Sequence, residues 1–310
     1  MRCAVFGGGG FIGSAVVDRL LLAGHEVRIF ERPRVTPYRV FEATEKVTWV
    51  RGDILSAHDV ADAVDGMDAV IHLVSTTLPK SSNEDPIFDV ETNVIGTLQL
   101  LNAMVSRQVG RMVFISSGGT VYGNPVYLPI DESHPTDPLV SYGVTKLAIE
   151  KYLAIFERTY GIRSIVLRVA NPYGERQRIE TAQGVIGAFL HNAIHDIPLE
   201  IWGDGSVTRD YVHVTDVAEA FVTALAYSGD KRVFNISSGT GVTLNELIVL
   251  MEESLGKPVA RRHLPGRPFD VRVSVLSNAL AREELRWIPR VSLQDGITRT
   301  ARWMKGQSAL

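Results

Sequence analysis

A glycine-rich turn near the start of the chain is the feature that most constrains its fold. Residues 3–13 read CAVFGGGGFIG, in which an apolar run precedes Gly7, Gly10 and Gly13 and a stretch with helical periodicity begins at Phe11. Glycine permits a turn with positive φ, and its missing side chain lets a pyrophosphate approach the main chain. The following helix would offer unpaired N–H groups and the positive end of its dipole. The pattern predicts a strand, a phosphate-binding turn and a helix.

An acidic residue follows at the spacing that dinucleotide binding requires. The next apolar run, Glu26–Phe30, is followed by Glu31, about twenty residues beyond the turn. A carboxylate there binds the adenosine ribose of NAD and repels the 2′-phosphate of NADP. Arg32 and Arg34 stand beside it, and an arginine at this place can accept that phosphate. We therefore expect NAD as the cofactor, with NADP as the less favoured alternative.

Short apolar runs alternate with helical segments as far as Arg168, which predicts an α/β fold with a Rossmann-type, doubly wound parallel sheet. Two long helices are expected, over Ile87–Ser106 and Ser141–Tyr160. Beyond about residue 170 the alternation weakens. We expect a nucleotide-binding domain of residues 1–169 plus about 209–233. A smaller C-terminal substrate-binding α/β domain would take residues 170–208 plus about 234–310.

Composition excludes several classes of protein. The chain has 310 residues, of which 45% are hydrophobic and 22% charged, as is ordinary for a globular protein. A net charge of −3 gives no electrostatic reason to expect a nucleic-acid partner. The single cysteine, Cys3, permits no intrachain disulfide, and no apolar run reaches membrane-spanning length. His72 and His213 lack neighbours at ligand spacing, so no metal is expected. A cytoplasmic protein without a membrane partner follows.

A tyrosine and a lysine stand four residues apart in the second long helix. Tyr142 and Lys146 therefore share one helix face. A phenol ordinarily titrates near pH ~10, and a nearby ammonium favours its charged form, which would make tyrosine a base near neutral pH. The same spacing is common on surface helices. Its place after the fifth strand of a dinucleotide-binding sheet favours the catalytic interpretation.

At these residues the chain resembles the extended branch of the short-chain dehydrogenase/reductase superfamily, the NAD-dependent epimerase/dehydratase family, which acts on nucleotide sugars. The resemblance covers nearly the whole chain. The matching segments are Gly7-x-x-Gly10-x-x-Gly13, Gly52-Asp53-Ile54, Ile71-His72-Leu73, Asn93-Val94-x-Gly96-Thr97, Ser116-Ser117, Val121-Tyr122-Gly123, Tyr142-x-x-x-Lys146, Leu167-Arg168-x-x-Asn171-Pro172-Tyr173-Gly174, Arg209-Asp210-Tyr211-Val212-His213-Val214-x-Asp216 and Arg267-x-x-Asp270.

The resemblance implies a role for each matching position, with Tyr142 as the acid/base and Lys146 as its activator. The residues expected at the cofactor are Gly7, Gly10, Phe11, Ile12, Gly13, Glu31, Arg32, Asp53, Ile54, Leu73, Val74, Ser75, Asn93, Ser116, Tyr142 and Lys146. Those expected at the substrate are Thr77, Tyr122, Asn171, Arg209, Arg267, Asp270 and Ser274. The two arginines would hold the diphosphate of the substrate, as guanidinium groups do. Tyr122 is equally compatible with a place in the core.

The chain departs from the family at one position. Members usually carry Ser or Thr four residues before the tyrosine of the Val-Tyr-Gly motif, and Gly118 stands there instead. The hydroxyl that normally bonds the substrate oxygen is therefore displaced. Ser117, Thr120 or a water molecule could replace it, and Ser117 is favoured because it is adjacent. Both hydroxyls could instead bond the local backbone.

Related 4,6-dehydratases carry an Asp-Glu pair directly before Val-Tyr-Gly, and related decarboxylases carry Glu at the position of Thr120. Gly119 and Thr120 provide neither, which disfavours both reactions. The resemblance thus favours an NAD-dependent 4-epimerase of UDP-glucose and UDP-galactose, and a small Ser274 would also admit N-acetyl sugars. A nucleotide 4-keto-6-deoxysugar reductase using NAD(P)H and a non-catalytic dinucleotide-binding sensor or scaffold stay open. The two long helices suggest a homodimer with a four-helix interface.

Overall fold

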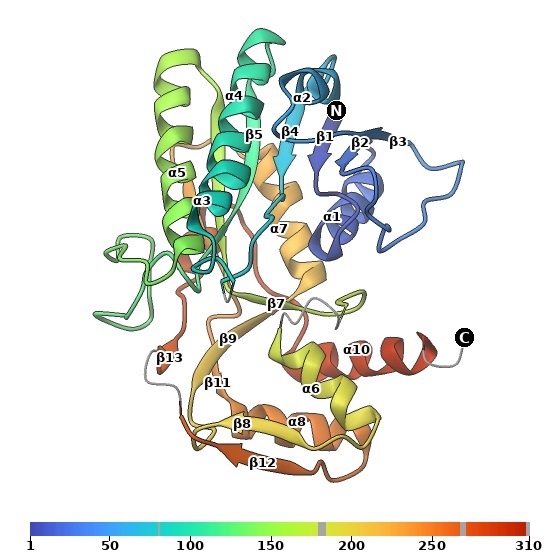
Figure 1. Cartoon of the computed structure of the whole chain (residues 1–310), viewed down its shortest axis with the longest axis vertical. Coiled ribbons are helices and arrows are strands. Elements are labelled where there is room, and N and C mark those ends of the chain that lie inside the picture. Colours follow the sequence, from blue (N-terminus) through green and yellow to red (C-terminus); the bar gives the residue numbers. More distant parts are fainter. Residues whose placement is uncertain (80, 179–183, 267–270, 308–310) are drawn as a thin grey trace.

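The computed structural model describes residues 1–79, 81–178, 184–266 and 271–307. Two units are stacked along the long axis, with the large sheet and its helices in one and β8, β12, α6, α8 and α10 in the other (Figure 1). The elements are β1 (Arg2–Phe6), α1 (Phe11–Leu22), β2 (Glu26–Glu31), β3 (Val47–Arg51), α2 (Ala57–Val64), β4 (Ala69–His72), α3 (Pro86–Asp89), η1 (Val90–Ile95), α4 (Gly96–Ser106), β5 (Arg111–Ser117), α5 (Ser141–Tyr160), β6 (Arg163–Val169), β7 (Asn171–Tyr173), α6 (Val185–Ile194), β8 (Leu199–Trp202), β9 (Thr208–His213), α7 (Val214–Ala226), β10 (Val233–Ile236), β11 (Gly241–Thr243), α8 (Leu244–Leu255), β12 (Arg261–Leu264), β13 (Val273–Ser274), α9 (Ala279–Glu284) and α10 (Leu293–Gln307).

The large sheet has seven strands in the order β10, β6, β5, β4, β1, β2 and β3, and each neighbouring pair is parallel. The strand order reverses between β1 and β4, which is where such sheets bind their ligands. This topology confirms the predicted doubly wound parallel sheet. The central strands read as continuous apolar runs because helices cover both faces of the sheet.

Two hydrophobic clusters hold the helices to the sheet. One face packs against α1, α7 and α9, and the other packs against α2, α4 and α5. Figure 1 shows α5 and α4 side by side at one end of the sheet, with α1 at the other. The carboxyl ends of the strands point toward the second unit, so residues that directly follow the strands meet at the junction between the two units.

The smaller unit has its own core. β9 pairs with β7, β11 and β13, β8 pairs with β12, and α6, α8 and α10 enclose a third apolar cluster. The expected boundary at residue 233 falls on the first residue of β10, which pairs with β6 as the seventh strand of the large sheet.

The helix expected over Ile87–Ser106 is not a uniform α-helix. α3 and α4 are joined by η1, a π-helical segment in which the turn is wider. The helix expected over Ser141–Tyr160 is confirmed as α5, and Gly161 ends it with a φ of +73°. Across the described ranges, no helix is both long enough and apolar enough to cross a lipid bilayer.

Candidate functional site

The glycine turn between β1 and α1 has the geometry of a phosphate cradle. Gly7 has a φ of +86°, and a Cβ atom on Gly13 would lie 2.0 Å from the carbonyl oxygen of Gly7. Side chains are therefore excluded where the helix meets the turn. Gly10 caps α1 without a side-chain hydrogen bond, which leaves the first N–H groups of the helix to an anion. These residues fit the pyrophosphate of a dinucleotide.

The residues expected at the adenosine end follow the neighbouring strands β2 and β3. Burial raises the pKa of the Glu31 carboxyl, and the backbone N–H groups of Arg32 and Gly9 oppose that rise. Asp53 accepts a hydrogen bond of 3.0 Å from the backbone N–H of Leu55. Arg32 is exposed to solvent. The carboxylate at the end of β2 thus faces the glycine turn, and the predicted contact of Arg32 with the cofactor stays a prediction.

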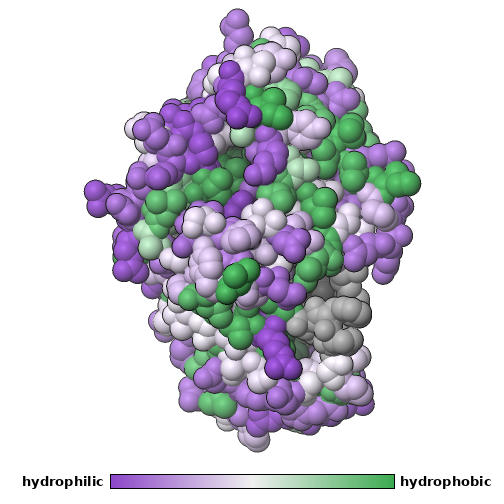
Figure 2. All heavy atoms as spheres, turned by 90° about the vertical axis from the view of Figure 1, so that its left-hand side faces the viewer, coloured by the Kyte–Doolittle hydropathy of each residue, from purple (hydrophilic) through white to green (hydrophobic). Residues whose placement is uncertain are grey.

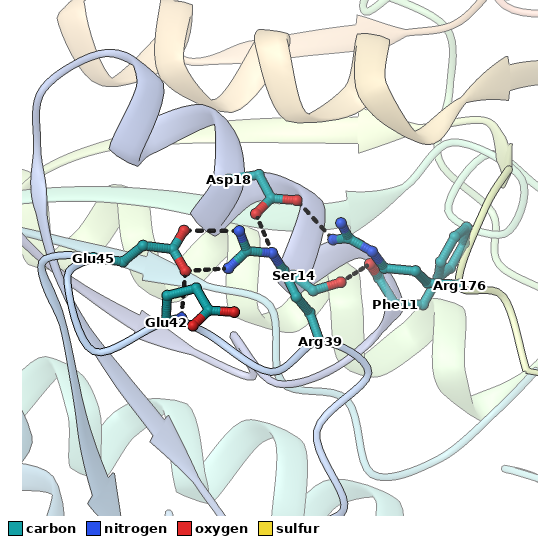
Figure 3. Close-up of polar contacts among 7 residues, drawn as sticks. All are labelled: Phe11, Ser14, Asp18, Arg39, Glu42, Glu45 and Arg176. Carbon is teal, nitrogen blue, oxygen red and sulfur yellow. Dashed lines mark hydrogen bonds and ion pairs between the residues drawn. The ribbon is translucent and has the colours of Figure 1, made fainter.

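A strap made of residues 32–46, between β2 and β3, closes over the glycine turn. Its Arg39 pairs with Asp18 of α1 at 2.9 Å and with Glu45 at 2.7 Å. Arg176, which follows β7, donates to the other oxygen of Asp18 at 2.7 Å (Figure 3). One carboxylate of α1 therefore binds two arginines, one from the strap and one from the segment that leads into the smaller unit.

Contacts of Tyr38 and Arg178 also hold the strap in place. The backbone N–H of Tyr38 donates to the carbonyl of Gly9 at 2.8 Å. The guanidinium of Arg178 lies 3.9 Å from the centroid of the Tyr38 ring and donates to the carbonyl of Pro37 at 3.0 Å. Sequence reasoning missed these contacts, because partners up to 158 residues apart leave no local pattern.

The residues after β4 lie next to the glycine turn. A Cβ on Gly7 would lie 3.2 Å from the backbone nitrogen of Val74 and 3.3 Å from the carbonyl carbon of Leu73, so this segment runs directly against the glycine turn. Asn93 accepts a 3.1 Å hydrogen bond from the backbone N–H of Thr76 and so fixes the same segment from η1.

Tyr142 and Lys146 face this segment from α5. The ammonium of Lys146 lies 5.5 Å from the centroid of the Tyr142 ring and donates to the carbonyl of Ile115 at 3.1 Å. Burial raises the pKa of Tyr142 to about 12, against the effect of its hydrogen bond with Ser75. Burial also lowers the pKa of Lys146 to about 8. Burial and the negative charge of Asp89 both favour the neutral phenol, so the expected effect of the Lys146 ammonium on Tyr142 stays a prediction.

The turn after β5 explains the missing hydroxyl. A Cβ on Gly118 would lie 2.3 Å from the side chain of Leu276 and 3.2 Å from the carbonyl oxygen of Arg168, so no larger residue fits without a shift. Ser116 donates its hydroxyl to the buried Glu150 and is turned away from the groove. The hydroxyl of Thr120 is buried and has no hydrogen-bond partner in the described part of the chain.

A cavity of about 760 Å³ lies in the smaller unit. Its lining includes Asn171 and Arg209, two of the residues predicted at the substrate, and also Tyr211, whose buried hydroxyl has no partner among the described residues. Asn171 donates to the carbonyl of Asp210 at 2.8 Å, which fixes its amide at the rim. The other lining residues are Pro172, Tyr173, Gly184, Val185, Ile186, Ala188, Phe189, Asn192, Ile197, Pro198, Glu200, Trp202, Val207, Leu244 and Arg262.

Three of the residues predicted at the substrate lie outside the lining of this cavity. Tyr122 is a core residue whose hydroxyl donates to Asn235 at 2.7 Å, so its aromatic ring packs the interior rather than a sugar pocket. Thr77 donates its hydroxyl to Asp89. Ser274 is buried on β13 beside Arg209 of β9, outside the lining of the cavity.

Two expected residues, Arg267 and Asp270, lie outside the described residues. The described ranges contain no group of three or more His, Cys, Asp and Glu side chains that could hold a metal ion.

The site also rests on buried charges that the motifs did not reveal. Glu150 of α5 and Arg168 of β6 form an ion pair of 2.6 Å in which both side chains are almost fully buried. Asp89 is fully buried at the end of α3. Sequence spacing could have pointed to each carboxylate as a neighbour of a predicted site residue. Glu150 stands four residues after Lys146, and Asp89 stands four residues before Asn93.

Curated relatives match along nearly the full chain. A putative UDP-glucose 4-epimerase of Methanocaldococcus jannaschii is 35% identical over 309 residues, covering 98% of each chain. A UDP-glucose 4-epimerase of Mycolicibacterium smegmatis is 36% identical and covers 99% of this chain and 100% of its own. A dTDP-4-dehydro-6-deoxyglucose reductase of Escherichia coli is 33% identical and covers 94% of each.

Solved structures agree with the fold. A UDP-glucose 4-epimerase of Thermotoga maritima with UDP-glucose superposes with a TM-score of 0.92 at 35% identity, covering 99% of this chain and 100% of its own. A UDP-glucose 4-epimerase of Thermus thermophilus in complex with NAD gives a TM-score of 0.90 at 34% identity, covering 99% of both. Residues 3–237 match the family described as the NAD dependent epimerase/dehydratase family. The chain belongs to that family.

Proposed function

We propose that this chain is an NAD-dependent UDP-sugar 4-epimerase that interconverts UDP-glucose and UDP-galactose. The observation that carries the proposal is the buried Tyr142–Lys146 pair, whose phenol bonds Ser75 in the segment that runs against the glycine turn. An acid/base group therefore stands at one end of a dinucleotide groove. The named relatives and the UDP-glucose-bound and NAD-bound neighbours support the same assignment.

Different residues of this chain have different roles in the proposed reaction. The turn at Gly7, Gly10 and Gly13 would hold the pyrophosphate of NAD, and Glu31 would hold the adenosine ribose. NAD, when bound, would supply reversible hydride transfer at C4 of the sugar. Tyr142 takes the proton of the C4 hydroxyl. It later returns the proton to the oxygen of the 4-keto sugar, after the sugar has rotated to present its other face. Burial raises the pKa of Tyr142 to about 12, and the positive charge of bound NAD would lower it and favour the base form.

We assign the hydroxyl that replaces the one missing at Gly118 to Thr120. Its buried oxygen lacks a partner within the described ranges, whereas the family position itself is closed by Leu276. The carbonyl oxygen of Thr120 would be 2.6 Å from a Cβ on Gly143, so this residue packs against the turn of α5 that carries Tyr142. This reverses the preference for Ser117. Thr120→Val should lower kcat more than Ser117→Ala does, and the opposite order would return the role to Ser117.

Conversion of UDP-glucose to UDP-galactose by the purified chain without added cofactor tests the activity. Tyr142→Phe should lower kcat by roughly 10²- to 10⁴-fold. Tyr160→Phe, an exposed tyrosine at the end of the same helix, should leave it unchanged. Net consumption of added NADPH with a 4-keto sugar would favour the reductase that the Escherichia coli relative suggests. Retained NAD without turnover would favour a sensor.

The surface of α3, η1 and α5 supports a homodimer with a four-helix interface. Its exposed apolar side chains include Ile87, Val90, Ile95, Val144 and Ile155. Figure 2 looks onto the side of the molecule that carries α5 and shows several apolar areas in its upper half. Such surface is rarely left uncovered in a monomer. Sedimentation should give twice the chain mass, and Ile155→Glu should give one chain mass; a monomeric wild type would refute the dimer.

A further inference from the structure

Asp89 is a buried carboxylate that none of the expected roles includes. It is the last residue of α3 and is fully shielded from solvent. Ser141 donates its hydroxyl to Asp89 at 2.6 Å, and the amide of Asn93 donates at 2.8 Å. Thr77 and Thr145 also donate their hydroxyls to it. All four donors are neutral, so the negative charge is buried without an ion pair among them.

These donors come from three different segments. Thr77 belongs to the loop after β4, Asn93 to η1, and Ser141 and Thr145 to the first turns of α5. The loop after β4 also carries Ser75, which bonds the phenol of Tyr142. Asp89 therefore fastens the loop, the π-helical segment and the catalytic helix to one another.

The titratable groups that face Asp89 come from α5. Tyr142 follows Ser141 directly, and Lys146 follows Thr145, so both are covalent neighbours of a donor. Glu150, farther along α5, is occupied by Arg168. Asp85 and Glu91, on the same stretch as Asp89, are exposed to solvent. The negative charge of Asp89 acts on Lys146, which directly follows the Thr145 that contacts Asp89.

We propose that Asp89 is a positioning residue for the Tyr142–Lys146 pair, whose buried charge keeps Lys146 an ammonium and whose hydrogen bonds hold the Ser75 loop against α5. The negative charge of Asp89 raises the pKa of both Lys146 and Tyr142, although burial has the larger effect on each. Both groups should therefore respond to its removal in the same direction. The proposal rests on the proposed epimerase activity.

The substitution Asp89→Asn removes the charge and preserves the shape. An amide oxygen can still accept from Thr77 and Asn93, and its NH₂ group can donate to Ser141. Without the negative charge, the pKa values of Tyr142 and Lys146 both fall. The whole pH profile of kcat should move by about one pH unit to lower pH. Glu91→Gln, an exposed carboxylate two residues away, is the matched control and should leave the profile in place.

A merely structural role predicts a different result. It would lower kcat at every pH and leave the profile where it is in wild type, and that outcome would overturn the proposal. An inactive wild type would instead refute the epimerase assignment, so the two failures are distinguishable.

A double-mutant cycle in urea unfolding tests the coupling between Asp89 and Lys146 without requiring enzyme activity. Asp89→Asn should lower the unfolding midpoint strongly in the wild-type chain, because it removes one of the two carboxylates that offset the burial of Lys146. In the Lys146→Met background the same change should lower the midpoint much less. Equal losses in the two backgrounds would show that Asp89 does not act through Lys146. The cycle applies even if Asp89→Asn alone folds poorly, since the double variant should then recover.

Discussion

Lys146 should make the ligand-free protein less stable than it would be with an apolar side chain at this position. The side chain is 2% exposed, and burial lowers the pKa of its ammonium to about 8 from an ordinary value of 10.5. At roughly 1.4 kcal/mol for each pKa unit, the charged form costs the folded state about 3 kcal/mol at pH 7. The hydrogen bond to the carbonyl of Ile115 returns about 1 kcal/mol. Replacing Lys146 by Met, which has a similar shape, should therefore raise the free energy of unfolding by about 2 kcal/mol.

The effect has a defined pH dependence. The folded pKa of Lys146 lies below the unfolded value, so between pH 8 and pH 10.5 the unfolded chain binds more protons than the folded chain. Wild-type stability therefore gains from this group as pH rises through that window, and the penalty is constant below it. The advantage of Lys146→Met should be full at pH 7 and should shrink as pH approaches 10.

Urea unfolding of the ligand-free protein at pH 7 and pH 9.5 measures both quantities. Lys151→Met, at an exposed position in the next turn of α5, is the matched control and should change stability little at either pH. The reasoning is refuted if Lys146→Met is less stable than wild type at pH 7, or if its advantage is the same at both pH values. In either case the ammonium would not be under a desolvation penalty.

Three further substitutions test other parts of the structure. Gly118→Ala places a Cβ 2.3 Å from the side chain of Leu276 and should lower the free energy of unfolding by about 1–3 kcal/mol in urea titrations. An unchanged unfolding midpoint would contradict the conclusion that Leu276 leaves no room for a side chain at Gly118. Arg39→Ala removes the ion pair between the strap and Asp18 of α1 and should lower the NAD content per chain after dialysis. Arg34 is exposed in the same loop, so Arg34→Ala should leave that NAD content unchanged. Ser274 pairs in register with Arg209, which lines the cavity, so Ser274→Tyr should reduce conversion of UDP-N-acetylglucosamine relative to UDP-glucose. An unaltered ratio of the two rates would remove this residue from sugar selection.

The parts of the structure that sequence predicted share one property, which is that their signals are local. The glycine spacing from Gly7 to Gly13 requires no distant partner to be recognised, and the same holds for the four-residue spacing of Tyr142 and Lys146. Strand and helix alternation likewise predicted the sheet, because each apolar run is contiguous.

The features that sequence missed depend on partners far along the chain. Leu276 closes the position of Gly118 from more than 150 residues away, and this contact decides which hydroxyl remains available. Arg176 meets Asp18 across 158 residues. The π-helical turn at η1 was also missed, since its sequence has ordinary helical periodicity. The amide of Asn93 bonds both the carbonyl and the carboxylate of Asp89 around that turn.

The electrostatics of the site follow from burial more than from any single pair. Desolvation is the first cause of the shifted pKa of both Tyr142 and Lys146, and it opposes the charged form of each. A chain that needed only a stable fold would not bury Lys146. Here two carboxylates, Asp89 and Glu150, raise the pKa of that lysine and offset part of the cost. Lys146 lies beside a phenol whose pKa burial raises to about 12, and a further positive charge next to that phenol would lower its pKa. Loading of the site would thereby make the phenolate easier to form.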